Sequence, residues 1–249
     1  MRTNRVSTIT CLVVTVAAIM AQAGCGSGEG NAPAASLNSP SQATVNASPS
    51  ADKGTVQDLT EVVASHASTE TPASFPKANM HPEVLISTDV GDIRIRLDAE
   101  KAPLTTENFL SNYVYRDFYP GTIFHYVQKD FMIAAGGYTA DLEAKETRAY
   151  LKSEADNGLK NKRGTIAMTR LPDHVDSATS QFYINLVDNP DLDYRGDETP
   201  EEVGYCVFGE VVDGMDVAEK IAEVPVADKD AFVNTPVEPI AIRSVELVR

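Results

Sequence analysis

The aromatic residues of this chain are distributed very unevenly, and their distribution limits where a folded core can form. The 249-residue sequence contains eight Phe and nine Tyr but no Trp, and of these only Phe75 precedes position 81. Large aromatic side chains supply much of the apolar surface that a domain buries. We therefore expect one folded domain over residues 81–249, preceded by a stretch that builds no core of its own.

The first 24 residues have the pattern of a signal peptide. Two Arg residues precede an apolar run over residues 9–21, which contains no acidic residue. The run is shorter than the ~20 apolar residues that a membrane span needs. Residues 21–23 (Ala-Gln-Ala) suit an ordinary signal peptidase, whereas residues 22–25 resemble a bacterial lipobox in which Gln replaces the usual Leu. We favour lipidation of Cys25, with a soluble exported form as the alternative.

Residues 25–80 have the composition of a tether. Ser, Ala, Pro, Thr, Asn and Gly dominate this stretch, and apolar residues recur without a strong period. Such a segment cannot bury enough apolar surface to offset the conformational entropy lost on folding. The expected organisation is a signal peptide over 1–24, a disordered tether over 25–80 and a folded domain over 81–249.

Charge and composition exclude several classes of partner. The chain has 36 acidic and 21 basic residues, a formal charge of -15, which argues against binding to nucleic acid. Three Cys cannot form a disulfide framework, and the four His show no metal-ligand spacing. The spacing from Asp191 to Glu202 is similar to a calcium loop, but Arg195 occupies a ligand position, so we interpret it as a solvated acidic loop. We expect neither a metal nor a cofactor.

Apolar patterns within the domain predict a β protein with two helices. Residues 84–86 and 93–97 flank an Asp/Gly turn and predict a hairpin. Pro103 opens a segment with helical spacing, and Val217, Ala218 and Ile221 predict a second helix. Further strands are expected over 122–127, 131–135, 164–169, 181–187, 205–212 and 240–247. Many strands with few helices between them favour a closed antiparallel barrel.

Several ordered motifs in this domain resemble the cyclophilin family, and most of all its bacterial branch. They are Phe124-His125, Phe131-Met132-Ile133, the segments 154–159 and 163–168, Asp176 to Asn185, and Val207-Phe208-Gly209 near the end of the chain. The resemblance covers about residues 83–248. It implies an eight-stranded closed antiparallel barrel capped by two α-helices. It also implies that the protein is a monomer without a cofactor and acts as a peptidyl-prolyl cis-trans isomerase on proline-containing polypeptide segments.

The resemblance also implies roles for individual residues. It places Tyr126 and Gln181 at catalytic positions. The residues that it implies for the proline pocket and the peptide groove are His125, Phe131, Met132, Thr169, Arg170, Phe182, Tyr183, Leu192 and Tyr205.

The sequence departs from the family pattern at two polar positions. Tyr126 follows Phe124-His125 where the family has Arg, and Ala134 stands where the family has Gln. Tyr can donate one hydrogen bond but carries neither a charge nor a fork of donors. Lys129 and Arg170, in neighbouring segments, are candidates for a displaced cation.

Two functional hypotheses follow. The first is a prolyl isomerase of the bacterial cell envelope, with reduced activity, that assists exported proteins and touches the membrane only through a lipid anchor at Cys25. The second is a catalytically silent module that binds proline peptides.

Overall fold

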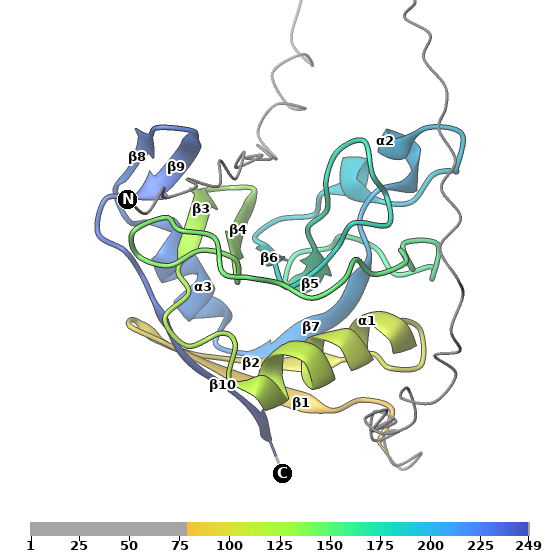
Figure 1. The fold of residues 1–249 in the computed structure, drawn as a ribbon, viewed down its shortest axis with the longest axis horizontal. Helices are drawn as coiled ribbons and strands as arrows, with labels where there is room; N and C mark the ends of the chain where they lie inside the picture. Colours follow the sequence, from red (N-terminus) through yellow and green to blue (C-terminus); the bar gives the residue numbers. More distant parts are fainter. Residues whose placement is uncertain (1–78, 249) are drawn as a thin grey trace, which may run out of the picture. The chain divides into compact units, whose positions relative to one another are not determined.

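The structure is a computed structural model that describes residues 79–248, and these form a mainly β domain (Figure 1). Eight strands make one antiparallel sheet in the order β10-β1-β2-β7-β5-β6-β4-β3. Their bounds are β1 Glu83–Thr88, β2 Gly91–Leu97, β3 Phe124–Gln128, β4 Met132–Ala135, β5 Thr165–Met168, β6 Phe182–Asn185, β7 Val207–Asp213 and β10 Ile242–Val248. The expected eight-stranded antiparallel architecture is confirmed. The signal peptide, Cys25 and residues 25–78 of the tether lie outside the described residues.

The sheet curls until its two edge strands, β3 and β10, approach each other. Ile123, next to β3, forms an antiparallel bridge with Ala241, next to β10. The amide of Phe124 donates to the carbonyl of Ile240 at 3.0 Å. These bonds pair backbone groups that an open edge would leave exposed. The barrel is thus closed by a short bridged contact rather than by a full strand ladder.

The helix expected after Pro103 is present, but much of it is not α-helical. Helix α1 spans Pro103–Glu107 and continues through a π-helical turn, Asn108–Tyr113, and a 3₁₀ turn, Val114–Arg116. Pro suits the first turn because its missing N–H would have no partner there. Asp117, with φ of 52°, ends the segment in the left-handed region.

Helix α3, Met215–Ala222, is the second expected helix, and its buried side contains Val217, Ala218 and Ile221 as the spacing predicted. Helix α2, Pro200–Val203, was not expected; the side chain of Thr199 accepts a hydrogen bond from the amide of Glu202 at its start. Among the described residues, no helix is both long and apolar enough to cross a bilayer.

A two-stranded hairpin beside the barrel was also not predicted. Its strands are β8, Val226–Lys229, and β9, Phe232–Pro236, and β9 packs against β3. The hairpin carries acidic residues at its turn and a Pro at the end of β9, and its apolar residues do not alternate, so the sequence offers no strand signal there.

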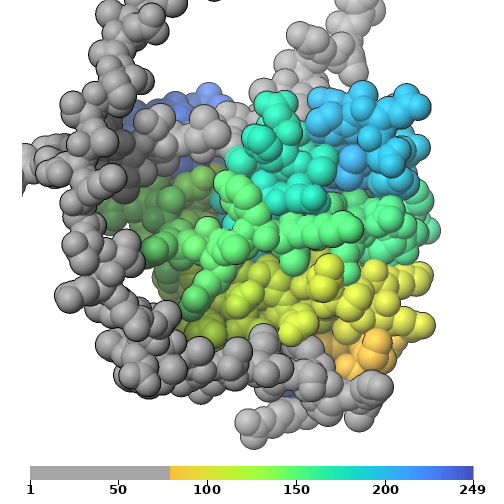
Figure 2. Space-filling view, turned by 45° about the vertical axis from the view of Figure 1, so that its right-hand side comes forward, coloured from red at the N-terminus to blue at the C-terminus, as the bar shows by residue number. Residues whose placement is uncertain are grey.

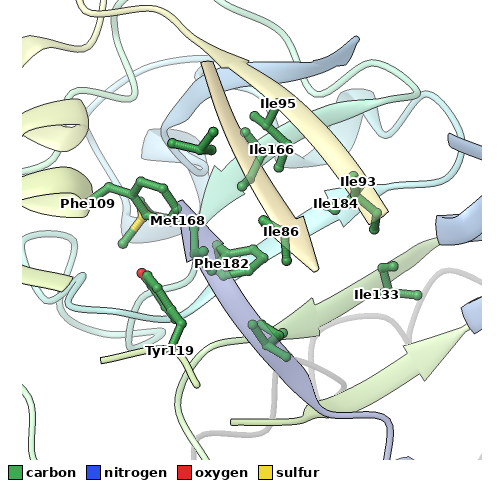
Figure 3. Packing of buried hydrophobic residues seen from close by; sticks show 14 of the residues in the cluster. Ile86, Ile93, Ile95, Phe109, Tyr119, Ile133, Ile166, Met168, Phe182 and Ile184 are labelled. Atoms are coloured by element: carbon green, nitrogen blue, oxygen red, sulfur yellow. The ribbon is translucent and has the colours of Figure 1, made fainter. Parts of the chain in front are cut away.

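Figure 3 shows the interior of the barrel, where Ile side chains of β1, β2, β5 and β6 meet aromatic rings. Phe109 packs against the rings of Tyr119, Phe182 and Phe208, with centroids 5.3–6.0 Å apart. The buried hydroxyl of Tyr119 donates to the carbonyl of Ser180 at 2.9 Å. The core therefore fills the barrel, and a binding surface has to lie outside it.

The segment over residues 136–164, between β4 and β5, contains no long strand or helix. Figure 2 shows its first part, in green, crossing the surface next to the helical segment that begins with α1, in yellow. A bridge between Leu151 and Ala178 and a hydrogen bond from the Ile123 amide to the Tyr138 carbonyl anchor it, and a bridge between Tyr138 and Ala144 closes a turn within it. This segment supplies one wall of the candidate site.

Candidate active site

A row of side chains crosses the outer face of the barrel. Tyr126 on β3 is paired with Ala134 on β4, which is paired with Tyr183 on β6. Tyr183 is paired with Ala167 on β5, and Ala167 with Val207 on β7. Residues paired across neighbouring strands share a face of the sheet. The register therefore brings the two substituted positions, 126 and 134, side by side.

This row is the centre of an apolar cluster on the outer face, which we call the outer cluster. Its other buried members are Phe131, Met132 and Leu192, and Leu159, Tyr205 and Val233 pack against it. The structure thus brings together six residues that the sequence assigned to the site: Tyr126, Phe131, Met132, Tyr183, Leu192 and Tyr205. Aromatic and aliphatic side chains of this kind suit a proline ring, which is apolar and compact.

A more polar pocket of about 210 Å³ contains the other expected groove residues. His125, Thr169, Arg170 and Gln181 line it, together with residues of the 136–164 segment. The Gln181 side chain lies across Gly137, where a Cβ atom would come within 2.5 Å of it. Gly at position 137 therefore lets the Gln181 amide lie against the backbone beside the pocket.

Phe182 does not belong to this surface, contrary to our expectation. It is fully buried in the barrel interior, with its ring 6.0 Å from that of Phe109 and 5.7 Å from that of Tyr119. Successive residues of a strand point to opposite faces. Since Tyr183 points outward, Phe182 has to point inward, and it supports the site only through the core.

The Tyr126 hydroxyl is engaged within the protein. It donates a hydrogen bond to the Oε1 atom of Gln128, two residues along β3. Burial raises the pKa of the Tyr126 phenol, and the Asn234 side chain of β9 opposes this shift in part. The phenol is therefore neutral at physiological pH, and this position carries a single donor without charge.

Arg170 is buried and bound to backbone carbonyls on several sides. Its Nε donates to the carbonyl of Gly204 at 2.9 Å, and its Nη1 to those of Leu171 at 2.9 Å and Pro172 at 2.8 Å. Its Nη2 donates to the carbonyl of Pro200. The guanidinium also stacks on the ring of Tyr205, 4.8 Å from its centroid. Its donors hold the loops around α2 and are not directed toward the outer cluster.

Two lysines near the site are engaged as well. Lys129 pairs with Glu223 of α3, with Nζ and Oε1 2.7 Å apart. Lys145 lies over the Phe118 ring, and its Nζ donates to the carbonyls of Phe118 and Pro120. Neither Lys129 nor Arg170, the two candidates from the sequence, therefore replaces the missing arginine in this structure.

A family model named "Cyclophilin type peptidyl-prolyl cis-trans isomerase/CLD" matches residues 83–247. This match includes all eight barrel strands, apart from the last residue of β10, and every residue of the outer cluster. The chain belongs to the cyclophilin family. Peptidyl-prolyl cis-trans isomerisation is the activity of these enzymes, and this cyclophilin is an enzyme of that class.

Curated relatives agree with this assignment. Peptidyl-prolyl cis-trans isomerase A of Dickeya dadantii is 45% identical over 172 residues, 69% of this chain and 87% of the relative. Peptidyl-prolyl cis-trans isomerase B of Escherichia coli is 47% identical over 162 residues, 65% of this chain and 97% of the relative. The match therefore covers most of each relative, and in this chain 82 residues precede the matched cyclophilin domain.

Solved structures agree in fold. A cyclophilin-type isomerase of Cryptosporidium parvum matches with a TM-score of 0.55 and 24% identity, over 68% of this chain and 98% of the other. The structure determined in the presence of the dipeptide Ala-Pro also gives a TM-score of 0.55, at 25% identity. These likenesses identify the barrel as a cyclophilin barrel.

The acidic loop expected from Asp191 to Glu202 folds around internal contacts. Asp193 accepts a hydrogen bond from the amide of Asn161 at 2.7 Å, and the carboxylate of Asp191 lies 3.8 Å from the guanidinium of Arg195. Within residues 79–248, no group of three or more His, Cys, Asp or Glu side chains is arranged to hold a metal ion.

Substitution of Arg170 by Lys tests its structural role in this cyclophilin. Lys keeps the charge but cannot reach four carbonyls at once, so buried carbonyls lose their donors. We expect the free energy of unfolding to fall by about 2 kcal/mol in urea titrations. The control is Arg163→Lys, at an exposed Arg that pairs with Glu219, with an expected loss below about 0.5 kcal/mol. Equal losses for the two variants would contradict the assigned role.

His125 makes the stability of the domain depend on pH. Burial lowers its pKa to about 4, despite an opposing contribution from the backbone of Ile123. The unfolded chain binds a proton near pH 6.5 and the folded chain does not, so stability falls as the pH drops from about 6.5 to about 4. The loss reaches at most about 3 kcal/mol. The free energy of unfolding measured across this range should depend less steeply on pH for His125→Gln than for the wild type. Identical pH dependences for the two proteins would contradict this role of His125.

Hairpin β8–β9 contributes site residues that the sequence analysis missed. Val233 packs against the outer cluster, and the Thr235 hydroxyl donates to the carbonyl of His125 at 3.0 Å. The ring of Phe232 lies 4.8 Å from that of Tyr138, which in turn lies 4.8 Å from His125. No local motif in this hairpin distinguishes it from a loop, so only its packing on β3 identifies it.

Proposed function

We propose that this cyclophilin isomerises X-Pro bonds in the groove formed by the outer cluster and the polar pocket, with reduced efficiency. The observation that carries the proposal is the pairing of Tyr126 with Ala134 at the centre of the outer row. The family resemblance expects an Arg and a Gln at these positions. In their place stand a neutral phenol bound to Gln128 and a methyl group.

The remaining groups support catalysis for a physical reason. Rotation about an X-Pro bond meets a barrier of about 18–20 kcal/mol because it breaks amide resonance. In the twisted state the prolyl nitrogen regains its lone pair and becomes a hydrogen-bond acceptor. A pocket that holds the proline ring while the carbonyl end rotates favours the twisted state without any covalent step.

Tyr126 and Gln181 have distinct roles in this proposal. The Tyr126 hydroxyl releases Gln128 and donates to the prolyl nitrogen as it pyramidalises. The Gln181 amide, beside the polar pocket, binds the peptide on the carbonyl side. A neutral donor stabilises the transition state less than a charged one, and this difference is the reason for the reduced rate.

A protease-coupled assay on an Ala-Pro peptide tests the proposal. We expect the wild-type protein to accelerate isomerisation above the rate in buffer, and Phe131→Ala to remove most of the acceleration because it opens the proline pocket. The control is Tyr115→Ala, at an exposed Tyr in the 3₁₀ turn after α1, which should leave the rate unchanged. No acceleration by a wild-type protein that still binds the peptide would favour the silent binding module.

We further propose that the protein works in the bacterial cell envelope on exported chains. The support is the pattern of residues 1–25, with a basic start, an apolar run and Cys25. The Ser/Ala/Pro-rich residues 25–80 would hold a monomeric catalytic domain away from the membrane. Membrane fractionation of the wild type and Cys25→Ser tests this proposal: the wild type should be found with the membrane and the variant in the soluble fraction. The same distribution for both proteins would contradict lipidation.

A further inference from the structure

One buried asparagine, Asn161, forms hydrogen bonds to two members of the outer cluster and to a loop residue next to it. Its side chain is 2% exposed. Its Oδ1 atom accepts a hydrogen bond from the Tyr183 hydroxyl at 2.7 Å, and its Nδ2 donates to the Leu192 carbonyl at 2.9 Å. Tyr183 and Leu192 belong to different parts of the fold, β6 and the 3₁₀ turn over residues 190–192. One amide therefore joins two members of the outer cluster.

The same network reaches a third member of the outer cluster, Phe131. The Oδ1 atom of Asn161 also accepts from Asn185 at 3.2 Å, and the Oδ1 atom of Asn185 accepts from Asn189 at 2.7 Å. The Nδ2 atom of Asn189 donates to the Phe131 carbonyl at 3.1 Å. The amide of Asn189 in turn donates to the carbonyl of Asn161 at 2.7 Å. Phe131, Tyr183 and Leu192 are thus connected through three buried asparagines.

Every hydrogen-bond donor and acceptor of the Asn161 side chain has a partner. Oδ1 accepts two hydrogen bonds, from Tyr183 and Asn185, and Nδ2 donates to the Asp193 carboxylate at 3.2 Å as well as to the Leu192 carbonyl. An asparagine amide offers two donors and two acceptors, and all are used here. Buried networks that are completely satisfied are rigid and specify one arrangement of the groups they join.

The Tyr183 hydroxyl depends on this network. Tyr183 is buried, and its hydroxyl would be an unpaired buried group if it had no acceptor. The hydroxyl donates to Asn161, so the polar atom of Tyr183 is satisfied within the protein while its ring remains part of the outer cluster. Burial of the Tyr183 hydroxyl therefore depends on the Asn161 amide.

We propose that Asn161 is a positioning residue for this cyclophilin: it does not touch the peptide, but fixes the relative positions of Phe131, Tyr183 and Leu192 and so sets the affinity for proline. This inference rests on the proposed function of the outer cluster as the proline pocket. Small displacements of pocket walls cost much in binding because they remove contacts on every side of a compact ring.

Substitution of Asn161 by Ala tests the proposal through binding and kinetics together. We expect Kd for an Ala-Pro peptide, from NMR titration of the folded protein, to rise roughly tenfold, with KM rising in parallel and kcat within about threefold. A role in global stability alone would instead lower the apparent kcat, in proportion to the unfolded fraction, and leave Kd and KM unchanged. That second pattern would overturn the proposal.

Asn108→Ala is the matched control. Asn108 is also a buried asparagine, and its Nδ2 donates to the carbonyl of Thr179 at 2.9 Å, but it has no bond to the outer cluster. We expect a comparable loss of stability for the two variants and a change of Kd for Asn161→Ala alone. An equal change of Kd for both variants would overturn the proposal.

A milder variant keeps the test decisive if Asn161→Ala does not fold. Asn161→Ser retains one hydroxyl in the network, and we expect an intermediate rise in Kd, about threefold. Wild-type affinity in this variant would contradict the positioning role. Because Kd is measured without catalysis, absence of isomerase activity in the wild type would refute the proposed function and leave this test intact.

Discussion

Replacing Tyr126 by Arg together with Ala134 by Gln is expected to raise kcat/KM on an Ala-Pro peptide by roughly thirty- to a thousandfold. This corresponds to about 2–4 kcal/mol of transition-state stabilisation, the usual magnitude for one preorganised donor. The two positions are paired across β3 and β4, so the new side chains lie side by side on the outer row. The guanidinium supplies the charged donor that the phenol lacks, and the amide restores a polar partner for the peptide. The measurement is the protease-coupled assay on the double variant and on each single variant.

The control for this experiment separates a local donor from a general change of charge. Leu104→Arg adds the same charge at an exposed position on α1 and should leave kcat/KM within about twofold. The single variant Tyr126→Arg should account for most of the gain, since Ala134→Gln adds no charge. A double variant that folds, binds the peptide and is no faster than the wild type would mean that the groove has changed in shape as well as in its polar groups.

Replacing Phe109 by Ala should lower the free energy of unfolding by about 3–5 kcal/mol, the largest stability effect that we expect for a single substitution. Phe109 is fully buried where the helical segment meets the barrel, and it contacts three other aromatic rings. Its removal leaves a cavity that rigid neighbouring rings cannot fill. Urea unfolding followed by circular dichroism measures the loss.

Tyr115→Ala is the matched control for Phe109→Ala. Tyr115 lies in the same helical segment but is 56% exposed, so its loss should cost less than about 0.5 kcal/mol. At urea concentrations below the unfolding midpoint of Phe109→Ala, its activity should stay near that of the wild type, because Phe109 faces the interior and not the outer cluster. A loss below about 1 kcal/mol for Phe109→Ala would contradict the packing described here.

Much of the fold could be predicted because most of its strands have a recognisable local sequence pattern. Alternation of apolar and polar residues over 93–97 predicts a half-buried strand, and β2 is one. The groove residues followed from ordered motifs, and the structure brings Phe131, Met132, Tyr183 and Leu192 into one cluster. Phe182 was misplaced because the motif fixes its sequence position and not its face. Once β6 is known to be a strand with Tyr183 outside, alternation alone corrects it.

The remaining parts depend on contacts between distant residues. The π-helical turn over residues 108–113 has the apolar spacing of an α-helix, so the sequence cannot distinguish the two. Hairpin β8–β9 is stabilised by packing on β3, about 100 residues earlier in the chain. Asn161 stands in a polar, turn-like stretch, and its importance arises only because its partners Tyr183 and Leu192 come from later segments.

In the proposed mechanism, the prolyl site of this cyclophilin has a neutral donor where the family resemblance implies a cation. A crystal structure of the protein with a bound Ala-Pro peptide would show which group faces the prolyl nitrogen. We expect the proline ring against Phe131, Met132, Tyr183 and Leu192, with the Tyr126 hydroxyl as the nearest donor to the prolyl nitrogen. A guanidinium or ammonium group within about 3.2 Å of that nitrogen, or a proline ring bound outside the outer cluster, would contradict it.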